Sequence, residues 1–587
     1  MDRLAEERAR GITIDLNFAP LRLPGGCVTG VVDVPGHEDF VRTMVAGAAG
    51  MDLVLLVIAD DEGIMPQTRE HLAIVEALGV PRGIPVLTKS DLVNPEWLAL
   101  VQEEVDGWLA ASSVTFGRAM AVSSLTRLGV EALQVALDME EAAAAPRDAS
   151  APFRMPVDRA FSVPGAGTVV TGSVWSGSVA VGDQLRLLPS DRAARVRTVE
   201  AHGERSARAL PGGRAALGLA NIDRHLVRRG DVLVDAGLPW ESTSALDVRI
   251  HLLPDAPRPL TSRTRVHLHL GTVEVIARVL PRSSIPPGGV GLARLACEAP
   301  LVAGGGDRFV LRSYSPVTTI GGGVVLDPLP PRRRPLWPDQ LDSPIPAERL
   351  VALLARHPPG ISSGSLGLRA GLSPAVVEVL LSQDDRAYRL PNGWALTDVL
   401  STARDRALEL LAGYHAGHPA LPGMPVETLR RGIHRAAPVA EAALDGLAAV
   451  GAIHAESGVV WSAGFEARIA GGDAAVARVI ELVRVAGLGA PSVQELERQL
   501  ERVDVVGALR LGAGAGEVEA VTRDWYVARA ALEGFRVTLM DAGKAGEITL
   551  GGLRDRTGLS RKYLIPLLEW ADRQGITRRD GEARRLT

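Results

Sequence analysis

The chain of 587 residues is poor in several residue types, and each shortage excludes a class of protein. Its two cysteines, Cys27 and Cys297, lie far apart and form no Cys-x-x-Cys spacing, so neither a disulfide framework nor a structural zinc site is expected. The longest apolar run, Leu53 to Ala59, is far shorter than the roughly 18 residues that a membrane-spanning helix needs. The first residues are charged and do not resemble a secretory signal. We therefore expect a cytoplasmic protein with no membrane partner.

Lysine is almost absent as well. Of the 64 basic residues only three are lysines, namely Lys89, Lys544 and Lys562, and arginine supplies the rest. Together with the abundance of alanine and glycine, this bias is typical of a GC-rich genome. The few lysines that remain are therefore positions to inspect for function, Lys89 and Lys562 above all.

The length and the changing pattern of the sequence predict several domains. Residues 1–148 alternate strand-like apolar runs with helical stretches, which predicts a doubly wound, mostly parallel α/β domain. In residues 152–330, short strands rich in Val and Leu are interrupted by Gly and Pro at short intervals. This spacing predicts two β-barrels, which we place at 152–240 and 241–330.

From residue 343 onward the sequence is mostly helical and contains an internal repeat. The segment Leu368-Arg369-Ala370-Gly371-Leu372-Ser373 recurs 187 residues later as Gly558-Leu559-Ser560. In both copies a short helix can end at the glycine and the serine can cap the next helix. Two strand-like runs around a glycine turn follow, which is the winged-helix pattern. We predict an α+β array of four winged-helix domains, at 343–398, 399–463, 464–527 and 528–587.

Three motifs near the N-terminus occur in the order that is typical of a translational GTPase. They are Arg10-Gly11-Ile12-Thr13-Ile14-Asp15, Asp33-Val34-Pro35-Gly36-His37-Glu38 and Thr88-Lys89-Ser90-Asp91. The Asp33 carboxylate would hold Mg²⁺ through water, and Thr13 would complete the shell of the cation when GTP is bound. The Gly36 amide can approach the γ-phosphate because glycine has no side chain in the way.

The loop Gly-x-x-x-x-Gly-Lys-Ser/Thr, which cradles the phosphates in such domains, should precede the first motif. The sequence contains no such loop. We therefore expect that the GTPase domain is truncated at its N-terminus and that the chain as given binds GTP poorly.

The third motif predicts specificity for guanine. The Asp91 carboxylate can accept hydrogen bonds from the N1 and N2 donors of guanine, and the stem of Lys89, which follows Thr88, would pack on the base. Hydrogen bonds to a charged group are worth about 1.5–3 kcal/mol each, and adenine lacks these donors. Any one of the motifs could occur by chance, but three in order on suitable elements argue strongly against chance.

These motifs, together with Gln67-Thr68-Arg69-Glu70-His71, resemble those of translation elongation GTPases. The variant Thr-Lys-Ser-Asp, in place of the usual Asn-Lys-x-Asp, is similar to that of the bacterial selenocysteine-specific elongation factors. The segments Asp158–Phe161 and Gly165–Gly172 resemble the second domain of that family. Ser560–Tyr563 and Thr577–Arg579 resemble its RNA-binding winged helix. The resemblance covers nearly the whole chain.

The resemblance implies a GTPase that uses GTP and Mg²⁺ and delivers selenocysteinyl-tRNA to the ribosome at UGA codons. It also implies that the C-terminal winged helices bind a hairpin in selenoprotein mRNA and that the factor acts as a monomer. His37 would orient the attacking water. The segment Ser123-Ser124-Leu125 would complete the guanine pocket, mainly through a backbone amide, although Ser124 stands where alanine is usual.

Discrimination between selenocysteinyl- and seryl-tRNA predicts an arginine-lined pocket. A selenol is largely ionised at neutral pH and a hydroxyl is not, so a cationic pocket would favour the selenolate. On the barrel that resembles the aminoacyl-binding domain, the candidates are Asp158, Arg159 and Arg214. Asp158 would orient a guanidinium or bind the amino group. The alternative is that Asp158 and Arg159 form an ordinary ion pair at a strand end.

The C-terminal segment 561–587 carries seven basic and four acidic residues. We predict that Arg561, Lys562, Arg578 and Arg579 contact RNA phosphates from a helix N-terminus and from the wing. The corresponding helix start in the first winged helix, at 373–378, has no basic residue. The alternative is a solvated face in an arginine-rich protein.

Two other functions stay open at this point. One is a general translation factor, which the winged-helix array disfavours because such a factor needs no arm that recognises a message. The other is a nucleotide-free winged-helix protein that binds RNA or DNA.

Overall fold

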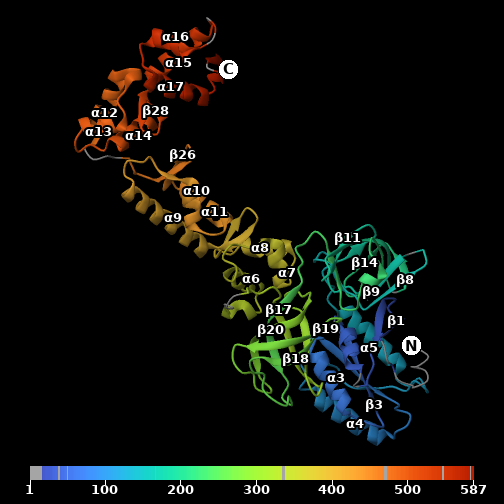
Figure 1. Cartoon of the computed structure of the whole chain (residues 1–587). Coiled ribbons are helices and arrows are strands. Elements are labelled where there is room, and N and C mark those ends of the chain that lie inside the picture. The colour runs from blue at the N-terminus through green and yellow to red at the C-terminus, as the bar shows by residue number, and fades with distance from the viewer. Residues whose placement is uncertain are drawn as a thin grey trace. The chain divides into compact units, whose positions relative to one another are not determined.

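The computed structural model describes residues 13, 16–37, 40–48, 50–165, 167–201, 203–332, 337–467, 472–544, 546, 548–581 and 583–587. The chain forms two compact units, Met1–Leu396 and Thr397–Thr587, which are called the first and the second unit below (Figure 1). Within the described residues no single helix is long and apolar enough to cross a membrane. Only the helices Ser363–Ala370 and Pro374–Ser382, bent by 100° to each other, pass that test as a pair.

The first unit begins with an α/β part. Its elements are β1 (Asn17–Arg22), β2 (Val28–Asp33), α2 (Val41–Ala48), β3 (Leu53–Ala59), α3 (Pro66–Ala77), β4 (Arg82–Thr88), α4 (Pro95–Leu109), β5 (Thr115–Phe116), β6 (Met120–Ala121) and α5 (Val130–Ala143). β4 runs parallel to β3, β5 and β6, whereas β1 and β2 form an antiparallel pair. Among the described strands β2 does not pair with β3, so the single sheet expected from the sequence is divided into two.

Helices cover both faces of the parallel sheet. Successive residues of a strand point to opposite faces. Leu87 of β4 therefore packs with Val101 and Val105 of α4, while Ile84 and Val86 pack on the side of α5. Burial on both faces explains why these strands are almost continuously apolar, and it gives the doubly wound arrangement that the sequence predicts.

The first barrel follows the α/β part. Its elements are β7 (Arg154–Pro156), β8 (Arg159–Val163), β9 (Gly167–Ser173), β10 (Val179–Ala180), β11 (Gln184–Leu188), β12 (Arg192–Ala201), β13 (Glu204–Ser206), β14 (Arg208–Ala209), β15 (Arg214–Ala220), the 3₁₀ helix η2 (Arg224–Leu226) and β16 (Val232–Asp235). The main strand order is β7-β16-β11-β12-β15-β9-β8. β7 and β8 stand at opposite ends of this order but are separated by only Val157 and Asp158 in the chain, so one bent segment closes the sheet.

The second barrel is a closed ring of antiparallel strands in the order β17-β20-β19-β18-β21-β22. The strands are β17 (Thr243–Leu252), β18 (Thr264–Leu270), β19 (Val273–Pro281), β20 (Val290–Leu301), β21 (Arg308–Ser313) and β22 (Thr319–Asp327). Leu246, Val248, Ile250 and Leu252 alternate along β17 and are buried in the barrel interior. This alternation is the period of two that is typical of barrel strands, in which every second residue faces the interior.

The first winged helix belongs to the same compact unit as the barrels. It consists of η3 (Asp339–Asp342), α6 (Pro346–Ala355), α7 (Ser363–Ala370), α8 (Pro374–Ser382), β23 (Ala387–Leu390) and β24 (Gly393–Leu396). As predicted, Gly371 ends α7 in a left-handed conformation with φ of 71°, and the Ser373 side chain caps α8 by accepting from the amide of Val376.

Buried charges fasten this winged helix to the closed barrel. The Arg356 side chain, which follows α6, has no solvent exposure and forms ion pairs with Asp247 of β17 and with Asp327 of β22, the latter at 3.2 Å. Asp247 is shared with Arg294 at 2.7 Å, and Asp327 is shared with Arg369 at 2.9 Å. Three arginines and two aspartates from the barrel and the winged helix thus form one network.

The second unit continues the winged-helix array. Its elements are α9 (Thr397–Gly417), β25 (Met424–Pro425), α10 (Val426–Ile433), α11 (Ala437–Ala449), β26 (Ile453–Glu456), β27 (Val459–Ser462), α12 (Gly472–Ala486), η4 (Gly487–Gly489), α13 (Val493–Gln499), α14 (Val505–Gly514), β28 (Val518–Thr522), β29 (Trp525–Ala528), α15 (Arg529–Lys544), α16 (Leu550–Thr557), α17 (Arg561–Arg573), β30 (Thr577–Asp580) and β31 (Ala583–Leu586). Three helices followed by a strand hairpin occur three times here. Gly558 ends α16 with φ of 70°, as predicted, but the Ser560 side chain makes no capping hydrogen bond to α17.

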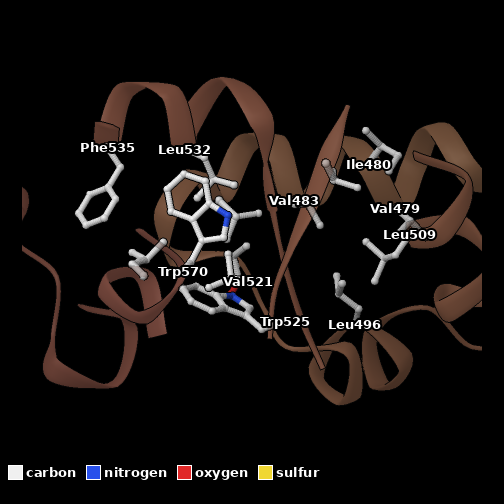
Figure 2. Packing of buried hydrophobic residues seen from close by; sticks show 14 of the residues in the cluster. Val479, Ile480, Val483, Leu496, Leu509, Val521, Trp525, Leu532, Phe535 and Trp570 are labelled. Atoms are coloured by element: carbon white, nitrogen blue, oxygen red, sulfur yellow. The ribbon is translucent and has the colours of Figure 1, made fainter. Parts of the chain in front are cut away.

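The last two winged helices share one hydrophobic core (Figure 2). Trp570 of α17 lies beside Val521 of β28 and near Trp525 of β29, so the fourth domain packs directly on the third. The Trp570 indole donates to Glu519 Oε1 at 2.7 Å, and the Trp525 indole donates to the carbonyl of Ala490 at 2.7 Å. The two domains therefore form one packed body at the C-terminus.

Arg356→Ala is expected to loosen the first winged helix, because it leaves two aspartates buried without their central partner. Breaking a buried ion pair in this way costs about 3–5 kcal/mol. Hydrogen exchange of the amides in α6, α7 and α8 measures this loss as faster local opening. Arg386→Ala is the matched control, since its exposed pair with Asp384 is worth only about 0–1 kcal/mol. Equal exchange rates in the two variants would contradict the role of Arg356.

Candidate functional site

The two side chains expected to hold Mg²⁺ lie together. Asp33 is the last residue of β2, and the Thr13 hydroxyl donates to Asp33 Oδ2 at 3.4 Å. Both supply oxygen atoms, which are the ligands that Mg²⁺ prefers. The other residues of the first motif, 10–12, 14 and 15, lie outside the described residues.

Gly36 and His37 follow β2 and are exposed. The His37 ring faces Phe40, with 6.0 Å between the ring centroids. His71 of α3 lies behind Gly36, where an added Cβ would be 3.8 Å from the His71 ring. Burial lowers the pKa of His71 below its usual value of 6.5, which favours the neutral form of the ring. The sequence analysis gave His71 no role, although its motif Gln67–His71 was recognised.

The guanine motif lies at the carboxyl end of β4. Thr88 ends the strand, and Lys89 adopts a left-handed backbone conformation with φ of 59°. The Lys89 ammonium donates to both Asp61 oxygens at 3.0 Å, which fixes the direction of its side chain. Asp91 is exposed to solvent. The ends of β3 and β4 therefore hold Lys89 in place and leave the Asp91 carboxylate accessible.

Ser123 lies beside this motif because the amide of Val122 donates to the carbonyl of Leu87 at 2.7 Å. The Ser123 amide itself donates to the carbonyl of Leu128 at 2.9 Å, and its hydroxyl accepts from the amide of Thr126 at 3.0 Å. Both groups hold the loop closed. The Ser123 amide is therefore occupied within the loop, whereas Ser124 and Leu125 of the same segment are exposed.

The helices α2 and α3, which follow Asp33 and Gly36 in the chain, contact the closed barrel. Arg42 of α2 pairs with Glu274 of β19 at 2.9 Å, and Glu274 also bonds to His267 Nδ1 at 2.8 Å. Glu70 of α3 accepts from the Thr319 hydroxyl at 2.7 Å. These contacts connect α2 and α3 to the barrel, and His267 takes part in them as a hydrogen-bonding group.

A cavity of about 320 Å³, called the aminoacyl cavity below, lies between β1 and the first barrel. Arg214 lines it and pairs with the buried Asp158 through both terminal nitrogens. The Thr171 hydroxyl donates to the same carboxylate at 2.6 Å. The Arg214 guanidinium lies 3.4 Å from the centroid of the Phe18 ring. Arg214 is therefore held between an anion and an aromatic face, and both interactions favour a cation.

Arg159 lines the same cavity, and its Nη2 donates to the carbonyl of Leu16 at 2.6 Å. The ion pair found for Asp158 is with Arg214, which lies 56 residues away in the sequence. Asp158 thus orients a guanidinium, one of the two roles expected for it. The alternative of a local pair between Asp158 and Arg159 is wrong.

The basic residues of the fourth winged helix fall into two groups. Arg584 is 9 % exposed and donates to Asp572 at 2.9 Å, and Arg573 donates to the carbonyl of Val521. Their guanidinium groups form hydrogen bonds that stabilise the fold of the second unit. The second group is exposed and contains the four predicted RNA contacts, namely Arg561, Lys562, Arg578 and Arg579.

The exposed cations differ in whether a neighbouring carboxylate compensates their charge. Arg561 is the first residue of α17, and Arg578 lies on β30; neither side chain has a hydrogen bond or ion pair within the described part of the chain. Arg579 donates to the carbonyl of Gly581 at 3.3 Å and forms no ion pair with a residue that the structure describes. The Lys562 ammonium lies 3.7 Å from Glu495 of α13, so its charge is partly compensated.

The wing of the first winged helix shows the opposite arrangement. Arg386 pairs with Asp384 at 2.7 Å, and Arg389 pairs with Glu378. The scaffold therefore repeats along the chain, while uncompensated wing arginines are found in the fourth copy.

Comparison with known families agrees with this architecture. Residues 1–142 match the family described as "Elongation factor Tu GTP binding domain", and residues 167–234 match "Elongation factor Tu domain 2". Residues 247–332 match "Selenocysteine-specific elongation factor, beta-barrel domain". Residues 408–460 and 542–586 match families described as "Elongation factor SelB, winged helix". The predicted fold class, a GTPase domain with two barrels and winged helices, is confirmed.

Two curated relatives are similar along almost their whole length. The selenocysteine-specific elongation factor of Desulfomicrobium baculatum is 34% identical over 100% of this chain and 95% of its own, and that of Escherichia coli strain K12 is 32% identical over 99% and 94%. The crystal structure of a bacterial selenocysteine-specific elongation factor, EF-Sec, has the same fold, with a TM-score of 0.71 and 24% identity over 100% of this chain and 95% of that one. A general translation factor or a nucleotide-free regulator is not favoured by these matches. The chain belongs to the selenocysteine-specific elongation factors and is a GTPase whose guanine-nucleotide-binding domain is of the elongation factor Tu type.

Proposed function

We propose that this GTPase delivers selenocysteinyl-tRNA to the ribosome at UGA codons, acting as a single chain that is tethered to a hairpin in selenoprotein mRNA. The observation that carries the proposal is the position of Arg214 in the aminoacyl cavity, fixed between Asp158 and Phe18. The family supplies the kind of cargo. The cavity supplies a physical means of recognising it.

The means of recognition is charge. Selenocysteine and serine differ by selenium in place of oxygen, and the selenol is the one that is ionised at neutral pH. The charged side chains that line the cavity are Arg159, Arg214 and the exposed Glu200, whose charge is screened by water. Asp158 lies behind Arg214 and occupies part of its guanidinium, which has five donors in all. The remaining donors of Arg214 favour an anion at this place.

Arg214→Ala is expected to reduce the preference for selenocysteinyl- over seryl-tRNA by about tenfold to a hundredfold, because a hydrogen bond to a charged group is worth about 1.5–3 kcal/mol. Equilibrium binding of the two charged tRNAs measures the preference. Arg208→Ala is the control, since Arg208 is exposed on the same barrel outside the cavity.

The same substitution leaves Asp158 buried without its partner and could weaken the barrel. The double variant Asp158→Asn with Arg214→Gln removes both charges and keeps similar shapes. If both variants, and Arg159→Ala as well, retain the wild-type preference, these residues do not select the cargo.

For nucleotide chemistry, we propose that Asp91 binds the guanine edge beside Thr88 and Lys89, and that the Gly36 amide approaches the γ-phosphate. Thr13 and Asp33 would hold Mg²⁺, which neutralises charge on the phosphates during transfer. The oxygen atoms of these two side chains support this assignment.

We propose that the exposed His37 orients the attacking water. His37→Ala is expected to leave the affinity for GTP unchanged and to lower ribosome-stimulated hydrolysis by about 10² or more, the usual scale of such a group. The affinity of the parent chain for GTP is measured first, as the reference for both variants. Asp91→Asn is the contrasting variant and should weaken guanine binding. Normal turnover in His37→Ala would assign His37 to packing with Phe40.

For the message, we propose that Arg561, Lys562, Arg578 and Arg579 contact the phosphates of an mRNA hairpin. The support is the exposed charge at the start of α17 and on β30. Recognition of RNA sequence usually targets looped bases, with phosphate contacts setting the orientation.

Replacing Arg578 and Arg579 by Ala is expected to weaken hairpin binding and to lower its salt dependence by roughly one unit of slope for each phosphate that the protein no longer neutralises. Fluorescence anisotropy over a series of salt concentrations gives both quantities. The matched control replaces Arg386 and Arg389, whose charges are already paired with carboxylates. Equal losses of affinity in both double variants would mean that the array binds RNA without a dedicated site.

A further inference from the structure

A second cavity, of about 470 Å³, lies in the first unit between the closed barrel and the first winged helix. It is called the junction cavity below. Its volume is typical of sites for small ligands. It is separate from the aminoacyl cavity and from the nucleotide and RNA residues. Four arginines and one carboxylate line it, namely Arg249, Arg308, Arg349, Arg369 and Asp342.

The arginines of this cavity are only partly compensated. Arg249 of β17 pairs with Asp342 at 2.7 Å. Arg349 of α6 donates to the carbonyl oxygens of Ser343 and Pro344, at 2.9 and 3.2 Å, and forms no ion pair with a described residue. For Arg308 of β21, the described part of the chain offers neither a hydrogen bond nor an ion pair to the guanidinium.

The carboxylates behind the cavity wall do not neutralise the excess positive charge of the arginines. Arg369 shares Asp327 with Arg356, and Arg356 shares Asp247 with Arg294, so two aspartates serve three arginines. The carboxylate of Glu348 accepts from the Ser343 hydroxyl and pairs with none of the cavity arginines. Positive charge is therefore in excess around a partly enclosed space.

The excess of positive charge is electrostatically unfavourable, and a bound anion would neutralise it. Burial, and then repulsion from Arg249, lower the pKa of Arg308, which shows that its charge is disfavoured where it stands. Guanidinium groups present planar forks of donors that match phosphate oxygens, and such charge-assisted hydrogen bonds are among the strongest in proteins.

We propose that the junction cavity binds a phosphate group, with Arg308, Arg349 and Arg249 as its ligands. The phosphate can belong to a free small molecule or to an RNA backbone, and the chemistry of recognition is the same. Arg308 also packs against Gly79 just beyond the end of α3, where an added Cβ would lie 3.0 Å from the guanidinium. A phosphate here would thus join the α/β part, the closed barrel and the first winged helix through one group of arginines.

The test measures binding of inorganic pyrophosphate by calorimetry to the full chain and to a variant with Arg308→Gln and Arg349→Gln. Neither arginine has a carboxylate partner among the described residues, so the variant should fold normally. The control is Arg386→Gln, an exposed arginine of the same winged helix that is paired with Asp384. A parallel arm uses a short RNA duplex unrelated to any hairpin, which distinguishes a backbone phosphate from a free one.

The expected result is a loss of at least tenfold in affinity for pyrophosphate, or for the duplex, in the double variant and not in the control. A loss confined to pyrophosphate identifies a small-molecule site, and a loss confined to the duplex identifies an RNA contact. Unchanged affinity for both probes would overturn the proposal. So would equal binding of pyrophosphate and chloride at the same ionic strength, which would show a non-specific positive surface.

Discussion

Buried arginine–aspartate pairs hold the first unit together, one inside the first barrel and two between parts of the unit. The three pairs are Asp158 with Arg214, Arg154 with Asp307, and Arg356 with Asp247. In each case both side chains are mostly withdrawn from water, and the partners come from different parts of the chain. Such pairs add little net stability because of desolvation, but they are intolerant of misalignment since an unpaired buried charge is costly. They therefore fix how the parts of this unit fit together.

The pair of Arg154 and Asp307 shows how many groups a single arginine can contact. Arg154 of β7 binds Asp307, which precedes β21, and lies 5.0 Å from the centroid of the Trp175 ring and 5.4 Å from that of Trp240. The planar guanidinium allows ion pairing at its edge and aromatic contact on its faces at the same time, which an ammonium group does less well. The near absence of lysine is therefore compatible with these junctions, whatever its genomic cause.

Arginines without a carboxylate partner indicate candidate positions for binding an anion. Arg214 and Arg356 hold parts of the fold in place, and an aspartate accompanies each of them. Arg308, Arg561 and Arg578 lack such a partner within the described residues, and each stands at a place where a phosphate could supply the missing charge. The contrast between paired and unpaired arginines separates structural positions from candidate binding positions more clearly than the number of charges does.

The sequence predicted those features that depend on local pattern. The apolar runs before Asp33 and Thr88 are strands, and Gly371 and Ser373 end one helix and cap the next. Features that depend on contacts between residues far apart in the sequence could not be predicted from it. The partner of Arg356 lies 109 residues away, and no periodicity indicates that the first winged helix joins the barrels.

The candidate sites likewise combine residues that the sequence predicted with contacts that it could not predict. Thr13 and Asp33 were assigned from motifs and lie within hydrogen-bonding distance. Ser123 was assigned to the guanine pocket by resemblance, whereas the hydrogen bond from its amide to Leu128 could be seen only in three dimensions. Arg214 was chosen as an arginine on the barrel that resembles the aminoacyl-binding domain, whereas its contact with Phe18 could be seen only in three dimensions. The roles proposed for these residues in binding stay predictions.

The central claim is that charge, held in place by Arg214, selects the cargo. The most direct test measures the affinity for selenocysteinyl-tRNA at neutral pH and at a pH low enough to protonate the selenol, with seryl-tRNA as the reference at both. The account predicts that the preference falls by about tenfold or more on protonation, because the charge-assisted hydrogen bond is lost. A preference that is the same at both pH values would contradict it.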